Sequence, residues 1–187
     1  MDNYQIDKIC YSNPKTRNLN NGCLVENNFN LDEDKIGFTI INTNLERSKE
    51  IGHWVMIFNL KSKFLFFDSF AKKPTHYGGS LSAIASRCKI LAPFQLQANT
   101  SITCGIYCIY FAYHLCMHKP IKSILKKFSK KNLVNNEKQV LKFYYTLTGS
   151  RYVCKSVFCV QRTFNIPCEH INCNCVVTNV LEKCGRS

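Results

Sequence analysis

The stretch QANTSITCGIYCIYFAYHLCMHKP, residues 97–120, contains the segment around which we expect the chain to fold. From Cys104 to Leu115 it is almost entirely apolar, aromatic or small, which predicts a helix buried on all sides. Thr103 is placed to be its N-cap, and Pro120 marks its end. A thiol in the first turn feels the positive end of the helix macrodipole, which favours thiolate. Cys104 is therefore a candidate nucleophile, although a lone cysteine in such a helix is more often a buried structural residue.

The composition indicates a globular protein with an anionic partner. A chain of 187 residues, 45% hydrophobic and 12% aromatic, predicts one domain with a sizeable core. We find no apolar run long enough for a membrane span and no signal-peptide core, so we expect an unsecreted protein without a membrane partner and with mostly reduced cysteines. The net charge is +13, of which residues 1–50 contribute −2. This asymmetry predicts an anionic partner for the later part of the chain.

The segments before and after the central hairpin give weaker signals. Residues 1–35 are rich in Asn and predict a short helix near Tyr4–Cys10 followed by loop. The β-branched run Phe38–Asn42 predicts a strand. A short helix is expected over Leu81–Arg87 and another strand over Lys89–Leu91.

Two strongly apolar runs predict a hairpin with a candidate catalytic pair at its open end. HWVMIF, which starts at His53, and KFLFFD, which ends at Asp68, flank a four-residue loop. If Phe58 pairs with Lys63, His53 lies directly opposite Asp68, with Cβ atoms about 4.5–5.5 Å apart. The carboxylate could then orient and charge a general base. A surface pair at the end of a sheet is the alternative.

Two residues near Cys104 could support chemistry on its thiol. Gln97 lies seven residues earlier, and its side-chain amide could form a two-donor oxyanion hole with the Cys104 backbone N–H. Taken alone, a loop glutamine is usually only a polar residue. Gly105 leaves room for another backbone, such as that of a substrate, to come close.

The order His53-Trp54, Asp68, Gln97, Cys104-Gly105 resembles the adenain-type cysteine proteases, typified by the adenovirus endoprotease. IINTNLERSKEIGHWVMIFNLKSKFLFFDSF (40–70) is similar to that family's segment with the histidine and the acid. QANTSITCGIYCIYF (97–111) is similar to the segment from glutamine to nucleophile, and NNEKQVLKFYYTL (135–147) to the late helix. The resemblance covers roughly residues 35–150. The acid here is Asp where the adenovirus enzyme has Glu, and either carboxylate can orient an imidazole.

The resemblance implies an α+β fold, in which a mixed sheet packs on a central buried helix that carries the nucleophile, as in adenain and the SUMO proteases. It implies that Cys104 is the nucleophile, His53 the base and then the acid, and Asp68 the residue that orients His53. Gln97 and the Cys104 N–H would hold the oxyanion. Trp54 matches the aromatic residue that the family places beside the histidine, with Gly105 supporting the substrate, but a hydrophobic strand residue is an equally good interpretation of Trp54.

The function that the resemblance implies is a cysteine endopeptidase acting on viral or mobile-element structural precursors near small residues such as Gly. Its location would be the virion or the host nucleus or cytoplasm. We expect a protease domain over residues 1–150 and a Cys-rich C-terminal extension over residues 151–187. A deconjugase of ubiquitin-like proteins on the same scaffold is one alternative, because the wider clan includes SUMO-deconjugating enzymes. A non-catalytic DNA-binding protein is another, since it would explain the charge.

A run of lysines follows the Cys104 segment and is a candidate nucleic-acid contact. Its members Lys122, Lys126 and Lys130 recur every four residues and would share one face of a helix. A solvated helix face is the usual meaning of such a run, but the net charge and the DNA cofactor of the adenovirus enzyme make DNA a candidate partner. The full set of candidates is Lys122, Lys126, Lys127, Lys130 and Lys131, with Lys119 just before them.

The extension over residues 151–187 concentrates cysteines. A zinc site could draw on Cys168, His170, Cys173 and Cys175, but C-x-H-x-x-C-x-C lacks the paired C-x2-C loops of zinc modules. We therefore predict no metal site and interpret these cysteines as packed or redox-labile thiols. The adenovirus enzyme is activated by a peptide joined through a disulfide, so a peptide activator, or the tail acting in its place, is a further candidate. No cofactor is expected for the chemistry itself.

Overall fold

A computed structural model describes residues 1–26, 29–30, 32–43, 52–61 and 63–149. The predicted extension, residues 151–187, lies outside these residues, and with it the zinc and disulfide interpretations. Within the described residues, no group of three or more His, Cys, Asp or Glu side chains could hold a metal ion. In the same part of the chain, no helix has the length and apolar character needed to cross a membrane.

The described residues form a five-stranded mixed sheet in the order β1-β2-β3-β4-β5. The three central strands are antiparallel neighbours, whereas β1 pairs parallel to β2 and β5 parallel to β4. Every residue of β3 and β4 is buried, because α3 covers one face of the sheet, and the short α2 together with loop residues such as Phe29 covers the other. The strands are β1 (Asn20–Val25), β2 (Gly37–Asn42), β3 (Trp54–Asn59), β4 (Phe64–Phe67) and β5 (Cys88–Ile90).

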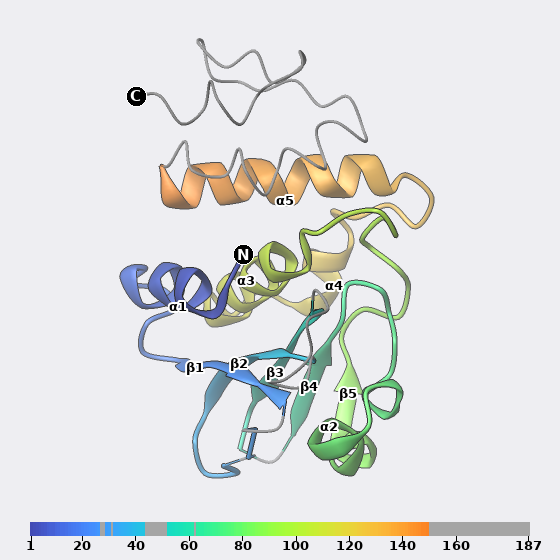
Figure 1. Cartoon of the computed structure of the whole chain (residues 1–187). Helices are drawn as coiled ribbons and strands as arrows, with labels where there is room; N and C mark the ends of the chain where they lie inside the picture. Colours follow the sequence, from blue (N-terminus) through green and yellow to red (C-terminus); the bar gives the residue numbers. More distant parts are fainter. Residues whose placement is uncertain (27–28, 31, 44–51, 62, 150–187) are drawn as a thin grey trace.

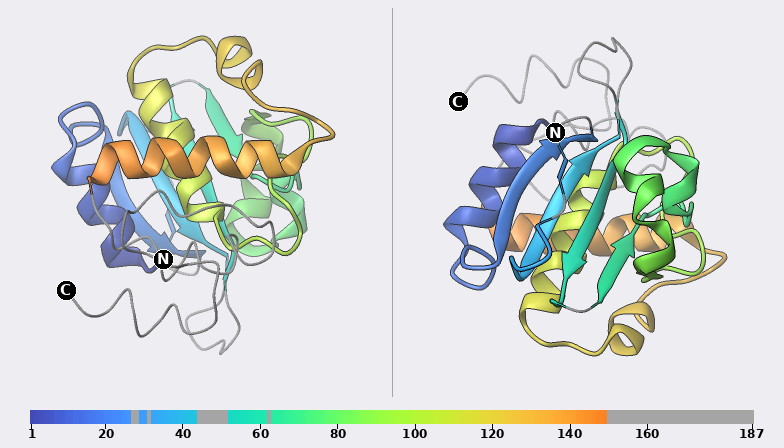
Figure 2. Two further views of the ribbon diagram at one scale, coloured as in Figure 1. Left: turned by 90° about the horizontal axis from the view of Figure 1, so that it is seen from above. Right: turned by 90° about the horizontal axis from the view of Figure 1, so that it is seen from below.

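The helices form layers on the sheet (Figure 1). α3 lies between the sheet and α5, packing on β3 and on α5, while α1 packs on β1 beside it. The view from above in Figure 2 shows α5 crossing over α3, and the view from below shows α2 on the opposite face of the sheet near β5. The helices are α1 (Asn3–Ser12), α2 (Gly79–Ala83), α3 (Cys104–Cys116), α4 (Ile121–Leu125) and α5 (Leu133–Thr148). A mixed sheet on a buried helix is compatible with the expected α+β class.

Local sequence explains where α1, α3 and α5 form. α3 follows from its apolar composition, and its residues from Cys104 to Ala112 are all buried. α1 begins with a capping box in which the Asp2 side chain accepts from the Gln5 N–H at 2.8 Å and the Gln5 side chain accepts from the Asp2 N–H at 3.1 Å. α5 ends at Gly149, whose φ of 59° gives a left-handed cap.

β1 corrects the sequence prediction, which treated this region as loop. Its sequence NNGCLV buries only Asn20 and Cys23, so it lacks the alternation of apolar and polar residues that identifies a strand. Gly22, at φ 108°, lies where the register of β1 against β2 shifts. Tertiary pairing with β2, rather than local preference, makes this segment a strand.

Candidate active site

The hairpin of β3 and β4 brings His53 and Asp68 together, but not by the predicted pairing. Asn59, not Phe58, is the last residue of β3 and pairs with Phe64. Continued past the strand ends, this register places His53 opposite Phe70, and their rings lie 4.8 Å apart between centroids. Asp68 becomes the diagonal neighbour of His53. A shift of two residues keeps every side chain on its face, so the two residues still meet.

Asn59 provides the physical reason for the longer strand. Its side-chain NH2 donates to three carbonyl groups, those of Asp32, Glu33 and Lys35, at 2.9–3.0 Å. Its side-chain oxygen accepts from the Lys61 N–H at 2.7 Å, with Lys61 at φ 72°. These bonds fix Asn59 as part of the sheet, and the four-residue loop therefore begins one residue later than predicted.

Asp68 is buried and is held by four hydrogen bonds. One carboxylate oxygen lies 2.7 Å from His53 Nε2 and accepts from the Phe70 N–H at 2.8 Å. The other accepts from the Lys72 N–H at 3.0 Å and from the Tyr77 hydroxyl at 2.6 Å. Asp68 is 1% exposed. A buried carboxylate with this many donors is fixed in position and stays ionised, so it is not the solvated surface pair considered as an alternative.

The pair shifts the pKa of both partners in opposite directions. Burial lowers the pKa of His53, but the hydrogen bonds from its ring to Asp68 and Cys104 outweigh burial and raise it to about 9. Burial raises the pKa of Asp68, but its bonds with His53, Tyr77 and Phe70 outweigh burial and lower it. His53 is therefore imidazolium and Asp68 carboxylate at neutral pH.

His53 connects Asp68 to Cys104. Nε2 is engaged by Asp68, so Nδ1 is the ring nitrogen left available to the Cys104 thiol, which lies close enough to raise the pKa of His53. Cys104 is the first residue of α3 and is 6% exposed. Its backbone N–H makes no hydrogen bond to any described residue, as expected for the first turn of a helix. The thiol, the imidazole and the carboxylate thus form a chain, with an open backbone donor beside the thiol.

Thr103 occupies the N-cap position, but its hydroxyl does not cap α3, which corrects the sequence expectation. The hydroxyl instead donates to a carboxylate oxygen of Glu137, on α5, and also contacts the Ser101 hydroxyl at 2.7 Å. A strong tertiary acceptor has displaced the local cap. The first N–H groups of α3 are consequently left free of that side chain.

Gln97 is fully buried in the loop that leads to Cys104. Its side-chain oxygen accepts from the Ser69 hydroxyl at 2.6 Å, and its NH2 group donates to the Ser101 carbonyl at 2.8 Å. Within the described residues this is the one hydrogen bond of the NH2 group, which keeps a second N–H. Since the amide is buried, a substrate carbonyl reaches that N–H only if the side chains around it give way.

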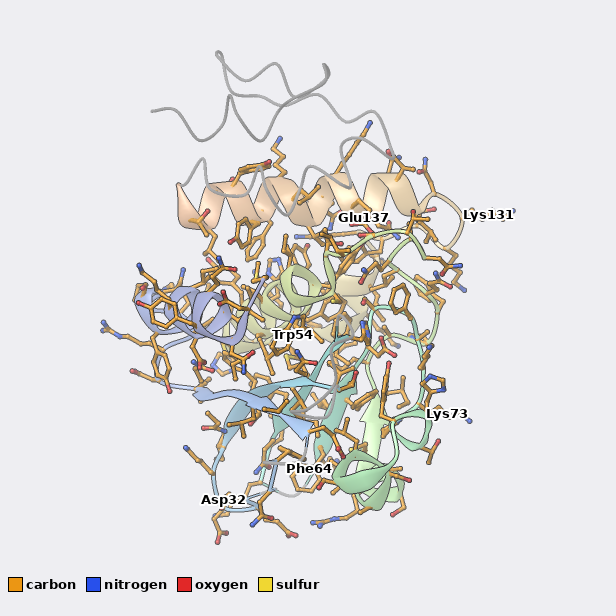
Figure 3. The ribbon with its side chains drawn as sticks, viewed as in Figure 1. Asp32, Trp54, Phe64, Lys73, Lys131 and Glu137 are labelled. Atoms are coloured by element: carbon orange, nitrogen blue, oxygen red, sulfur yellow. The ribbon has the colours of Figure 1, made fainter. Side chains whose placement is uncertain are left out.

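The space beside Gly105 is filled by the protein itself. A Cβ at this position would lie 3.2 Å from Ile6 Cδ1, 3.3 Å from Trp54 Cδ1 and 3.5 Å from Met1 Sδ. The expectation that a substrate backbone uses this space is therefore wrong for the side of Gly105 that a Cβ would occupy. Trp54 is 5% exposed and its ring faces Gly105, which supports the structural interpretation of this residue. Figure 3 shows Trp54 in the interior, between the sheet and the helices above it.

The other thiols in the described part of the chain are poor nucleophiles. Cys108, one turn after Cys104, is fully buried and donates to the Trp54 carbonyl at 3.4 Å. Burial raises the pKa of Cys108 well above its ordinary value, and that of Cys10 to about 12. Burial likewise raises the pKa of Cys88 and of Cys116 to about 11, and it raises the pKa of Cys23 above its ordinary value. At neutral pH these five thiols stay protonated.

The lysine run does not form one helix face, which corrects the prediction for this segment. α4 ends at Leu125, so Lys126 and Lys130 are not on a common helix with Lys122. The chain leaves the helix to bury Phe128, and the Asn136 side chain then binds both the N–H and the carbonyl of Ser129. The lysines are nevertheless all exposed, and Figure 3 shows Lys131 in the turn that enters α5. The exposed residues are Lys119, Lys122, Lys126, Lys127, Lys130 and Lys131.

Three residues around the site were not predicted from the sequence. Tyr77 donates to Asp68 and lies over His53, with ring centroids 6.0 Å apart. Ser69 holds Gln97, and Glu137 holds Thr103. None of the three belongs to a sequence pattern, because each acts through a contact with residues distant along the chain.

The chain matches no protein-family model and no curated protein. The argument for a function therefore depends on the site.

Proposed function

We propose that this chain is a cysteine endopeptidase of the adenain type. The observation that carries the proposal is that His53 binds the buried Asp68 carboxylate through Nε2, while the Cys104 thiol is close enough to raise the pKa of the same imidazole. Peptide hydrolysis by a cysteine thiol requires a base that lies between a carboxylate and a nucleophile, here a nucleophile at a helix N-terminus. A structural cysteine has no need of a charged histidine, and a DNA-binding module has no need of the chain of three groups.

The geometry suggests the following chemistry. The imidazolium of His53 stabilises a thiolate on Cys104, whose sulfur attacks the carbonyl carbon of the scissile peptide. The oxygen of the tetrahedral intermediate takes up negative charge and is bound by the Cys104 N–H and the second N–H of Gln97. When the C–N bond breaks, His53 gives its proton to the leaving amine and a thioester remains. His53 then takes a proton from water, hydroxide attacks the thioester, and the thiolate is restored.

The surroundings of the thiol support a preference for small residues at the cleaved bond. Cys104 is only 6% exposed, and the Phe70 ring lies beside the His53 ring. A large side chain next to the scissile carbonyl would meet the Phe70 ring. Glycine-rich sites in precursor proteins, such as viral or mobile-element structural proteins, would avoid this contact.

The experiment that tests the proposal is labelling with a thiol-reactive peptidyl probe ending in Gly-Gly, followed by peptide mapping. Wild type should be labelled at Cys104, and Cys104→Ala should not be labelled. Cys88→Ala is the matched control, because Cys88 is half-buried yet lacks a histidine partner, and it should label like wild type. Labelling that persists in Cys104→Ala would refute the assignment. Release of a ubiquitin-like protein without cleavage of free peptides would instead favour a deconjugase.

We also propose that the exposed lysines between α3 and α5 contact DNA. Lysine contacts with phosphates release counterions, so the slope of log K against log salt should be about −0.9 per contact on duplex DNA. Replacing three of them by Gln should flatten that slope by about two to three units. A triple Gln variant in Lys61, Lys63 and Lys89, exposed residues elsewhere on the molecule, should keep it. Equal slopes for the two triple variants would refute the contact. The lysines to replace are Lys122, Lys126 and Lys130.

A further inference from the structure

Glu137 is a buried acid outside the catalytic chain of groups. It lies on the side of α5 that faces α3 and is 0% exposed (Figure 3). One of its carboxylate oxygens accepts from the Ala98 N–H at 3.2 Å, and the other accepts from the Thr103 hydroxyl. Ala98 directly follows Gln97, and Thr103 directly precedes Cys104. The two oxygens thus reach the neighbours of both candidate oxyanion donors.

We propose that Glu137 is a positioning residue, whose carboxylate holds Gln97 and the Thr103–Cys104 peptide unit in the geometry that binds the oxyanion. The inference rests on the proposed function. It assigns to α5, which contributes no catalytic group, the alignment of the loop that joins Gln97 to the nucleophile.

Neighbouring bonds show that this loop is fixed from two sides. From the sheet, the Ser69 carbonyl accepts from the Leu96 and Gln97 N–H groups at 2.8 and 3.1 Å. From α5, Asn136 donates to the Leu96 carbonyl at 3.0 Å. Within the loop, Gln97 itself donates to the Ser101 carbonyl, and from outside the loop Glu137 bonds to Ala98 and Thr103. Without it, the loop would stay attached at Leu96 but would lose its anchor next to the thiol.

A carboxylate at this place carries a cost that a merely structural residue would avoid. Burial raises the pKa of Glu137, and hydrogen bonds from Thr103 and Ala98 offset part of that rise. An apolar residue would avoid the desolvation but would leave the Ala98 N–H and the Thr103 hydroxyl without this acceptor. Two acceptor oxygens, spaced to meet two donors at once, are what the site requires of residue 137.

The expected effect is on turnover and not on the thiol. His53 and Asp68 are held by the hairpin, and Cys104 by α3, so they do not depend on Glu137. Loss of one oxyanion donor lowers kcat by about 10²–10³. Misalignment in Glu137→Ala should therefore lower kcat by about 10–100-fold, with KM nearly unchanged and with the rate of Cys104 alkylation by iodoacetamide unchanged.

Glu137→Gln should recover most of the activity. Its oxygen can accept from Ala98, and its NH2 can donate to the Thr103 oxygen, whose own proton can turn to Ser101. Thr103→Val removes the same contact from the loop side and should reproduce the Glu137→Ala loss, which keeps the test open if Glu137→Ala does not fold. Val140→Ala creates a cavity on the same buried face of α5. It is the control for general destabilisation, and the variant should keep the kcat of the wild type.

A double-mutant cycle separates positioning from structure. Glu137→Ala and Gln97→Ala disable the same oxyanion site, so the double variant should be little worse than Gln97→Ala alone. Additive losses, a slower alkylation of Cys104, or a Glu137→Ala variant as active as Val140→Ala would overturn the positioning role while leaving the protease intact. A wild type that neither hydrolyses peptides nor labels at Cys104 would refute the proposed function and this inference with it. Faster hydrogen exchange of the Ala98 amide in Glu137→Ala is the further expected result, and unchanged exchange would overturn the anchor.

Discussion

The raised pKa of His53 makes the stability of the protein depend on pH in a defined direction. The pKa of His53 is about 9 in the folded chain, against 6.5 for the free side chain. Between these values the folded state binds a proton that the unfolded state lacks. The free energy of unfolding therefore has its full contribution from His53 below pH 6.5 and loses it as pH rises to 9.

The size of the effect follows from the shift. A difference of 2.5 pKa units corresponds to about 3 kcal/mol. The side chain of His53 is 17% exposed and Asp68 is 1% exposed, so solvent screening removes little of it. The lowered pKa of Asp68 adds a second dependence of opposite sign, in which stability is lost as pH falls below about 4. The pair should contribute most between pH 4 and 6.5.

Urea unfolding at half-unit intervals from pH 5 to 9 measures this contribution as the difference between wild type and His53→Gln. Ionisation of the buried thiols destabilises both proteins above about pH 8.5, so this effect cancels in the difference. The difference should shrink by about 3 kcal/mol between pH 6.5 and 9. In the Asp68→Asn background the acceptor charge is gone. The effect of His53→Gln on the free energy of unfolding should then be nearly independent of pH. Parallel curves for wild type and His53→Gln across this range would refute the ion pair.

Three shorter predictions concern the neighbours of the pair. Tyr77→Phe removes one of four donors to Asp68, so we expect a loss of about 1.5–3 kcal/mol in urea unfolding and an upward move of the acid limb of the pH–rate profile. Gly105→Ala should leave the free energy of unfolding within about 1 kcal/mol, because better helix propensity offsets close contacts, but should lower kcat/KM as Trp54 is pushed aside. Iodoacetamide at pH 7 should modify Cys104 before Cys108 by mass mapping.

Each of these has a result that would count against it. An unchanged acid limb in Tyr77→Phe would mean that the hydroxyl does not stabilise the Asp68 carboxylate. Full activity in Gly105→Ala would show that Trp54 can move without consequence for His53. Modification of Cys108 before Cys104 would mean that the reactive thiol lies one helical turn after the residue that we assign.

The sequence predicts those parts of the fold and site that depend on local composition. The apolar run after Thr103 predicts a buried helix, and two apolar segments around a short loop predict a hairpin; both elements form. The approach of His53 to Asp68 was predicted from a wrong register. It still holds, because an error of two residues returns each side chain to the same face of the sheet.

The parts that could not be predicted are those that depend on distant contacts. Glu137 stands in NNEKQ, a polar sequence that reads as a solvated helix face, yet it is buried because α5 covers the loop before Cys104. In the sequence Tyr77 is an ordinary aromatic residue in a loop, and only the folded chain brings its hydroxyl to Asp68. The lysine spacing suggested a long helix, but burial of Phe128 ends it early. In each case tertiary packing overrides the local pattern.

Two adjacent residues directly after β4 each bind a different part of the candidate site. Asp68 holds the imidazole, while Ser69 holds the loop of Gln97 through its carbonyl and its hydroxyl. Since one peptide bond joins Asp68 and Ser69, the proposed base and the proposed oxyanion donor Gln97 are held by the same strand end. A displacement of that strand end would move His53 and Gln97 away from Cys104 together. Loss or gain of activity on such a movement should consequently be concerted, with no intermediate in which one half of the machinery is set and the other is not.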